Sequence, residues 1–131
     1  MKQIIIDLDG TLTIDSKCNY KDKPINVKVL KQIKYYKNLG FRIVIFTSRN
    51  MRTYEGDIKK MQIYTLPIII DWLKKHDVPY DDIIIGKPWC GFDGFYVDDK
   101  AIRPSEFVEK TYDEILDILK NENPYKDGGN R

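Results

Sequence analysis

Residues 4–11 read IIIDLDGT, an apolar run that ends in two acids, a glycine and a threonine. Three β-branched apolar residues in a row predict a parallel strand that is buried on both faces. Alternate side chains of an extended chain share a face, so Asp7 and Asp9 are expected to point the same way and Leu8 to point back. Two acids this close repel each other and stay ionised most readily beside a cation. A surface turn at Gly10 is the alternative, but a turn does not need an apolar triple before paired acids.

The rest of the chain alternates apolar strands with amphipathic helices. We expect further strands at 41–46, 82–86 and 95–97, and helices at 27–38, from 62 or 65 to 76, and from 104 or 105 to 120. Asn26 and Gly40 are suitable cap residues for the first helix, and Pro67 fits the second helix only near its first turn. The alternation predicts an α/β fold, a three-layer Rossmann-like parallel sheet with helices on both faces.

Length and composition place further limits on the function. The 131 residues, with a net charge of +2, predict one domain over residues 1–120 with a short flap at 12–25, and a polar, disordered tail at 121–131. The nearly balanced charge argues against nucleic acid, and no apolar run approaches membrane-spanning length. We expect a cytoplasmic protein with Cys18 and Cys90 as free thiols. Because His76 is the sole histidine, acid–base chemistry falls to carboxylates, Lys, Tyr or Cys.

Polar side chains follow each of the four expected strands at the point where it ends. In order along the chain they are Asp7 with Asp9, Thr47, Lys87, and Asp98 with Asp99. Parallel sheets bind ligands at the carboxyl ends of their strands, so these side chains are expected to share one site. Taken singly, Lys87 could be a loop lysine, Thr47 a strand-ending residue and the acid pair a turn. Their joint placement favours a functional site.

The Asp-x-Asp-Gly-Thr stretch at residues 7–11 resembles the first motif of the haloacid dehalogenase (HAD) superfamily of phosphohydrolases, and the other three clusters match its later motifs in type and order. The resemblance implies that Asp7 is the nucleophile that forms an aspartyl-phosphate, and that Asp9 is the general acid and then the base. It also implies Mg²⁺, an ion suited to oxygen ligands. The implied ligands of Mg²⁺ are Asp7, the Asp9 carbonyl and one of Asp98 and Asp99, with Asp99 favoured. Thr47 is implied to donate a hydrogen bond to a phosphoryl oxygen. Lys87 is implied to pair with the phosphoryl group and with Asp7.

Residues 47–53 and 86–104 are similar to a HAD subgroup associated with capsular polysaccharide biosynthesis. This resemblance implies a small phosphorylated precursor of a surface glycan, such as a sugar, polyol or amino-alcohol phosphate. The implied substrate contacts are Ser48, Arg49, Asn50, Arg52, Trp89 and Arg103. The arginines could instead balance acidic charge, and Trp89 could be a packing residue. The chain leaves no room for a full cap domain, so the flap is the expected lid, with help from a neighbouring subunit if the protein is a homo-oligomer.

Two other functions fit parts of the pattern. A phosphatase of a macromolecule, either a phosphoprotein or a nucleic-acid end, would be permitted by the missing cap. A signalling receiver domain also uses an aspartyl-phosphate and Mg²⁺, but its phospho-accepting acid follows a middle strand, whereas here the acids open the chain. A catalytically weak metal-binding homologue is disfavoured because the motif residues are intact. The sequence leaves open the leaving group, the pathway and the role of Cys90.

Overall fold

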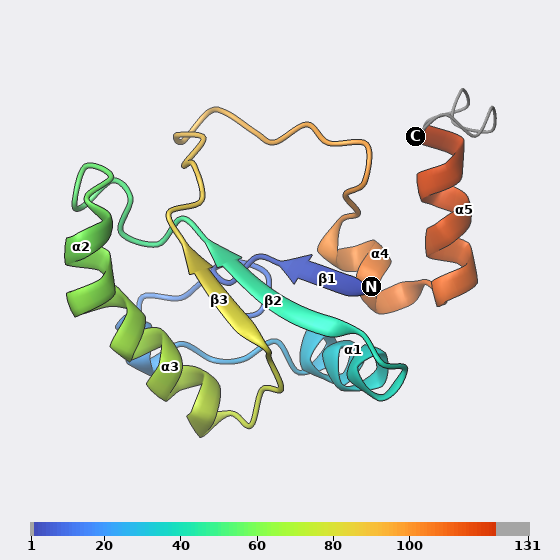
Figure 1. Ribbon diagram of the computed structural model, residues 1–131, viewed down its shortest axis with the longest axis horizontal. Coiled ribbons are helices and arrows are strands. Elements are labelled where there is room, and N and C mark those ends of the chain that lie inside the picture. Colours follow the sequence, from blue (N-terminus) through green and yellow to red (C-terminus); the bar gives the residue numbers. More distant parts are fainter. Residues whose placement is uncertain (1, 123–131) are drawn as a thin grey trace. The chain divides into compact units, whose positions relative to one another are not determined.

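The structure, a computed structural model, describes residues 2–122 of the chain (Figure 1). It divides into two compact units, the first ending at Trp89 and the second beginning at Cys90. The expected polar tail at 121–131 lies, from residue 123 onward, outside the described residues.

Three parallel strands form the sheet of the first unit. They are β1 (Gln3–Ile6), β2 (Arg42–Thr47) and β3 (Asp82–Ile85), in the spatial order β1-β2-β3. Ile6 is opposite Ile45, and Thr47 is opposite Ile85, so the three strands end at the same edge of the sheet. The predicted α/β class and parallel sheet are therefore confirmed.

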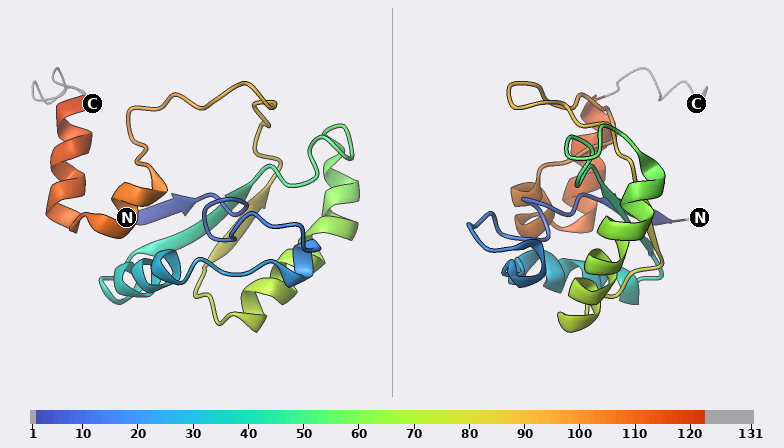
Figure 2. Two further views of the ribbon diagram at one scale, coloured as in Figure 1. Left: turned by 180° about the vertical axis from the view of Figure 1, so that it is seen from behind. Right: turned by 90° about the vertical axis from the view of Figure 1, so that its left-hand side faces the viewer.

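Helices α1 (Val27–Asn38) and α3 (Leu66–Lys75) cover one face of this sheet (Figures 1 and 2). The core between helices and sheet is formed by fully buried apolar side chains, among them Val29, Ile33, Ile43, Ile45, Ile69, Trp72 and Leu73. The other face is less covered, since Ile5 is 55% exposed and Ile84 is 44% exposed. The prediction that β1 is buried on both faces is wrong, because Ile6 faces the core while Ile5 lies on the less covered face of the sheet.

The second helical region begins earlier than predicted. A short α2 (Ile58–Lys60) is capped by the Asp57 carboxylate, which accepts a hydrogen bond from the Lys60 amide at 3.2 Å. A π-helical segment, η2 (Met61–Thr65), then leads directly into α3. Pro67 lacks an amide proton and its ring crowds the preceding turn of an α-helix. The wider π turn ends just before Pro67, which allows one helical run to continue through it.

The flap at residues 12–25 is tied down at both its base and its far side. An antiparallel bridge between Thr13 and Ile25 closes the base. Its outer part contains a short 3₁₀ helix, η1 (Tyr20–Asp22), and the next carbonyl, of Lys23, accepts a hydrogen bond from the Trp72 indole at 2.8 Å. The flap is thus fixed to α3 and is the main segment between β1 and α1. Among the described residues there is no inserted cap domain.

The second unit holds two helices where one was predicted. They are α4 (Pro104–Glu109) and α5 (Tyr112–Glu122). Lys110 has extended backbone angles, which ends α4. Thr111 and Glu114 then form a capping box, in which the Glu114 amide donates to the threonine hydroxyl at 3.2 Å and the Thr111 amide donates to the glutamate at 2.9 Å. The Thr-x-x-Glu pattern was the sequence signal for this break.

The fourth strand predicted at 95–97 is also not found. These residues belong to no strand, and Phe95 and Val97 are 80% and 87% exposed. A strand needs a partner for its backbone hydrogen bonds. Within the described part of the second unit, residues 90–122, the regular elements are helices alone, so this apolar run has no strand of its own unit to pair with.

Two expectations about the environment of the chain can be compared with the structure. Cys18 and Cys90 are both free thiols. Across residues 2–122, none of the helices combines the length and the apolar character needed to cross a membrane.

Candidate active site

The turn that follows β1 places the two acids. The amides of residues 11–13 all donate to the Leu8 carbonyl, at 2.9–3.3 Å, and Gly10 has a φ of 80°, which side-chain-bearing residues rarely adopt. Leu8 is fully buried, whereas the side chains of Asp7 and Asp9 keep 33% and 27% of their surface exposed. The predicted alternation, with both acids on one side and Leu8 in the core, is therefore present.

Asp7 receives two side-chain contacts. The Thr11 hydroxyl donates to Oδ2 at 3.0 Å, and Lys87 Nζ lies 3.5 Å from Oδ1. The Lys87 backbone amide donates to the Thr47 carbonyl at 3.1 Å, so the chain stays hydrogen-bonded to β2 two residues beyond the end of β3. The structure thus brings Lys87 to Asp7, as the sequence predicted, through the register of the sheet.

Asp9 is held by a buried arginine. Arg49 Nε donates to Oδ2 at 2.9 Å and Nη2 donates to Oδ1 at 2.8 Å, a two-pronged contact in the geometry that guanidinium and carboxylate prefer. The Thr13 hydroxyl lies 3.4 Å from the same Oδ1. Arg49 is only 4% exposed, and its Cζ lies 4.1 Å from the centre of the Tyr20 ring of the flap.

Arg49 was expected either to contact substrate or to balance acidic charge. The structure shows a charge-balancing contact, because two of the three guanidinium nitrogens bind Asp9, and contact with substrate stays a prediction. The third, Nη1, is buried and has no hydrogen-bond partner among the described residues.

Thr47 ends β2 and is almost fully buried. Its hydroxyl oxygen accepts a hydrogen bond from the Arg49 amide at 3.1 Å, which fixes the rotamer and leaves the hydroxyl proton to be donated elsewhere. Asp7, Asp9, Arg49 and Lys87 together pair two carboxylates with two cations. The charges at the carboxyl ends of the strands therefore nearly cancel.

The first unit offers part of an oxygen site for a divalent cation. The Asp7 carboxylate is part-exposed, and within the described residues no backbone amide donates to the Asp9 carbonyl. Both are oxygen ligands of the kind that Mg²⁺ prefers. No cluster of three or more His, Cys, Asp or Glu side chains within residues 2–122 is close enough to hold a metal by itself. The oxygens present fit a hydrated Mg²⁺ that keeps several waters.

The acid pair after residue 97 lies in the second unit. Asp98 Oδ1 accepts a hydrogen bond from the Lys100 amide at 2.9 Å, while Asp99 is half-buried. Arg103 is exposed and stands at the start of α4, where its amide donates to Glu106 Oε1 at 2.8 Å. Which of the two acids binds metal, and whether Arg103 contacts substrate, remain predictions.

Asn50 has a structural part in the loop after β2. It adopts a φ of 63°, a left-handed conformation that asparagine tolerates better than most residues. Its Oδ1 accepts a hydrogen bond from the Thr65 hydroxyl at 2.7 Å, and its Nδ2 donates to the Thr53 hydroxyl at 3.3 Å. Both polar ends of the side chain are thus engaged within the protein.

The remaining expected substrate contacts lie around the same loop. The Arg52 guanidinium carbon is 5.9 Å from the centre of the Trp89 ring, and Trp89 is 40% exposed. The Ser48 carbonyl accepts a hydrogen bond from the Met51 amide at 3.0 Å, which turns the chain after β2. Trp89 is therefore a partly exposed ring beside a cation and not a core residue.

Three residues of the site were not found from the sequence. Thr11 and Thr13 each lie four residues after the acid that their hydroxyl contacts, Asp7 and Asp9. This repeated spacing was the signal that could have identified them. Tyr20, which stacks on the arginine, lies in an irregular polar stretch that carries no pattern.

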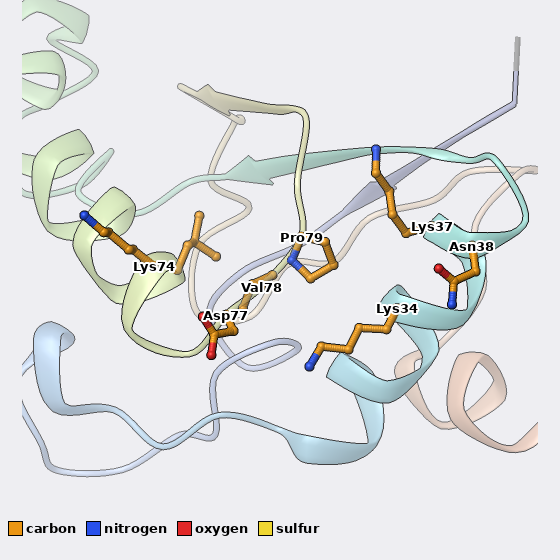
Figure 3. Close-up of a pocket in the computed structure, with 8 residues that line it drawn as sticks. Lys34, Lys37, Asn38, Lys74, Asp77, Val78 and Pro79 are labelled. Atoms are coloured by element: carbon orange, nitrogen blue, oxygen red, sulfur yellow. The ribbon is translucent and has the colours of Figure 1, made fainter.

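A hollow at the other edge of the sheet does not contain these residues (Figure 3). It lies between the end of α1 and the segment that leads from α3 to β3. Its lining includes Lys34, Lys37, Asn38, Leu73, Lys74, Asp77, Val78 and Pro79. Because these segments precede β2 and β3, the hollow is at the amino-terminal ends of the strands, away from the acids.

The fold and this set of strand-end residues define a phosphohydrolase-like α/β domain, and the comparison with protein families agrees. The chain matches the haloacid dehalogenase-like hydrolases over residues 4–126. It therefore belongs to the haloacid dehalogenase-like hydrolase family, and it is an enzyme of a family whose members are typically phosphatases.

Solved structures extend this comparison. The crystal structure of a target protein from Vibrio cholerae is 54% identical in sequence, with a TM-score of 0.92 over 93% of this chain and 99% of that one. A chain of the Pnkp1/Rnl/Hen1 complex is 19% identical, with a TM-score of 0.50 over 92% of this chain and 42% of that one, and this likeness shows the fold alone. No curated protein sequence matches the chain.

Proposed function

We propose that the protein is a Mg²⁺-dependent phosphomonoesterase that hydrolyses a small phosphorylated metabolite through an aspartyl-phosphate on Asp7. The observation that carries the proposal is the meeting of Asp7, Asp9, Thr47 and Lys87 at the carboxyl ends of three parallel strands. Membership of the hydrolase family supports the same reaction class.

In the proposed reaction each of these residues takes the part that the family resemblance implies. An Asp7 oxygen attacks phosphorus, the bond from phosphorus to the leaving oxygen breaks, and Asp9 donates a proton to that oxygen. Water then attacks the phosphorus of the aspartyl-phosphate as Asp9 takes its proton, which releases phosphate and regenerates the Asp7 carboxylate. The Thr47 hydroxyl and the Lys87 ammonium would stabilise charge on the phosphoryl oxygens.

Mg²⁺ would be held by the Asp7 carboxylate, the Asp9 carbonyl and an acid of the pair Asp98–Asp99. When bound, it would reduce the repulsion between a carboxylate and a phosphate dianion. The Lys87 ammonium, 3.5 Å from Asp7 Oδ1, supplies part of the same neutralisation from the protein.

The proposed substrate is a sugar, polyol or amino-alcohol phosphate that serves as a precursor of capsule or surface polysaccharide in the cytoplasm. The support is the resemblance of residues 47–53 and 86–104 to the corresponding HAD subgroup. The proposed partner is this small substrate and neither nucleic acid nor membrane; a homo-oligomer would add cover to a site whose own lid is the flap.

The test is phosphate release from a panel of small phosphate esters, with Mg²⁺ and with Mg²⁺ removed by a chelator. We expect release that requires Mg²⁺ and falls by at least ~1,000-fold in Asp7→Asn, because the nucleophile is lost. The variants Asp98→Asn and Asp99→Asn identify the metal ligand. Replacing the direct ligand should raise the Mg²⁺ concentration needed for a half-maximal rate, and replacing the other acid should not. Asp71→Asn, at an exposed acid on α3, is the matched control and should behave as wild type.

Phosphopeptides and phosphorylated oligonucleotides belong in the same panel. Release from these and from no small ester, by a folded protein, would overturn the metabolite as substrate and leave the phosphatase class intact. Release that persists in Asp7→Asn would overturn the nucleophile itself.

A further inference from the structure

We propose that Arg49, stacked on Tyr20 of the flap, is a positioning residue that orients the Asp9 carboxylate for proton transfer to and from the substrate. This inference rests on the proposed phosphatase function and adds to it a link between the flap and the acid–base residue. The evidence is the two-pronged contact of the buried Arg49 with the part-exposed Asp9 carboxylate, and the Tyr20 ring that covers the guanidinium.

The guanidinium fixes the plane of the carboxylate as well as its position. Two parallel hydrogen bonds of 2.9 and 2.8 Å to different oxygens remove the freedom of the Asp9 side chain to rotate. Asp9 would otherwise swing on a two-bond side chain at a turn. A general acid must lie within hydrogen-bond reach of the leaving oxygen, so this restraint acts directly on the proton-transfer geometry.

The arginine itself is fixed from two further sides. Its backbone amide donates to the Thr47 hydroxyl at 3.1 Å, which fixes the backbone of Arg49 to the end of β2. Its guanidinium is covered by the Tyr20 ring at 4.1 Å, and the side chain is 1% exposed. A lysine could supply the charge but not the planar fork or the stacked face.

The ring belongs to a segment that is anchored independently. The Thr13–Ile25 bridge closes the base of the flap, and the Trp72 indole donates to the Lys23 carbonyl at 2.8 Å, three residues after Tyr20. The flap therefore holds the ring over Arg49 through contacts that do not involve either acid. The position of Tyr20 is in this way transmitted to the Asp9 carboxylate through the Arg49 side chain.

The role has a specific consequence for different leaving groups. When the bond from phosphorus to the leaving oxygen breaks, an alkoxide needs the proton of Asp9, whereas 4-nitrophenolate leaves without one. A displaced Asp9 should therefore slow transfer from an alkyl phosphate and spare the first transfer from 4-nitrophenyl phosphate. The second step, in which Asp9 takes a proton from water, slows with either ester.

The experiment compares the two esters in rapid-mixing measurements with Mg²⁺ present. We expect Arg49→Leu and Arg49→Lys to slow transfer from the alkyl ester by about 100-fold and about tenfold, within the range of general acid catalysis. The burst of 4-nitrophenolate should change by less than about twofold, followed by a slowed steady state. Tyr20→Leu should give the same pattern more weakly, and Tyr20→Phe should recover most of that loss because it keeps the ring.

Two controls separate positioning from loss of structure. Lys23→Met removes a second cation near the Tyr20 ring, 5.2 Å from its centre, and leaves Arg49 in place, so the rates with both esters should be unaffected. In an Asp9→Asn background, Arg49→Lys should have no further effect on the alkyl ester, because the group that it positions is already lost. Melting curves establish that each variant is folded.

An equal loss on both esters, or additivity of Arg49→Lys with Asp9→Asn, would overturn the positioning role while the phosphatase function stands. An unchanged alkyl rate in Tyr20→Leu would overturn the link to the flap. Failure of the wild-type protein to hydrolyse either ester is a different result, and it would overturn the proposed function.

Discussion

The two ends of the same sheet hold ion pairs of similar length in different surroundings. At the carboxyl end, Arg49 and Asp9 are 2.8 Å apart, and the arginine side chain is 1% exposed. At the amino end, Lys37 and Asp81 are 2.6 Å apart, with both side chains about a third exposed. Exposed pairs contribute little to stability, whereas a buried charge depends strongly on its partner.

The difference follows from what each pair is attached to. Asp81 directly precedes β3 and is attached to β2, since its amide donates to the Ile43 carbonyl at 2.7 Å and its carboxylate accepts from the Ile43 amide at 2.8 Å. Asp9 is attached to a turn, and its carboxylate accepts from side chains. Two ion pairs of similar length therefore have different parts. The Lys37–Asp81 pair lies where β3 joins β2, and the Arg49–Asp9 pair orients the proposed acid–base group.

The largest expected effect on stability comes from removing the carboxylate partner of the buried Arg49. Asp9→Ala leaves the Arg49 charge buried and without its carboxylate, which should lower the free energy of unfolding by ~3 kcal/mol, measured in urea. The matched variant Arg49→Met/Asp9→Ala removes the charge as well and should recover most of that loss. A loss below ~1 kcal/mol in Asp9→Ala would show that water solvates the arginine, contrary to its burial.

Much of the fold could be predicted because its signals are local. The isoleucines of β1, the apolar run of β2 and the Asn26 cap of α1 each act within a few residues, and all three elements form where expected. The strand expected at 95–97 depended on a pairing partner, which a sequence pattern does not supply. The π turn before Pro67 was likewise not predicted. The apolar pattern indicates a helix and the proline opposes one, and the sequence does not say that a wider turn accommodates both.

The candidate site divides in the same way. The chain order of the strands was sufficient to bring Lys87 to Asp7, because parallel strands end at one edge. The partner of Asp9 was not predicted, since Arg49 reaches it from 40 residues away through a buried side chain. Long polar side chains have many rotamers, so their endpoints depend on packing that only the folded chain defines.

A smaller effect is expected at the amino end. The Lys37 ammonium, and after it the Ile43 amide, hold the pKa of Asp81 below its ordinary value of 3.8. The stabilisation is thus present above this value and is lost as the pH falls through the lower pKa of the folded state. Asp81→Asn should lower the free energy of unfolding at neutral pH by much less than Asp9→Ala does, and the difference from wild type should shrink in strong acid.

Lys37→Met should cost still less than Asp81→Asn, because the Ile43 amide keeps its acceptor. The loss should diminish in high salt, as expected for a pair that is open to solvent. A cost equal to that of Asp9→Ala would contradict the distinction between the two ends of the sheet.

The smallest effect concerns His76, which directly follows α3 and lies on the side of the sheet where the strands begin. Burial, and then the neighbouring Lys75 charge, lower the pKa of His76 from its ordinary value of 6.5. Its ring centre lies 4.5 Å from that of Trp72, and among the described residues its Nε2 is buried without a hydrogen-bond partner. The unfolded chain therefore takes up the proton first as the pH falls, so stability decreases from about pH 7 through 6.5 until the lower pKa of the folded state is reached.

His76→Phe keeps an aromatic ring against Trp72 and cannot titrate, so its free energy of unfolding should change less with pH over this range. Equal slopes in wild type and His76→Phe would contradict the prediction, whereas Asp81→Asn should keep the wild-type slope here because Asp81 titrates only at lower pH.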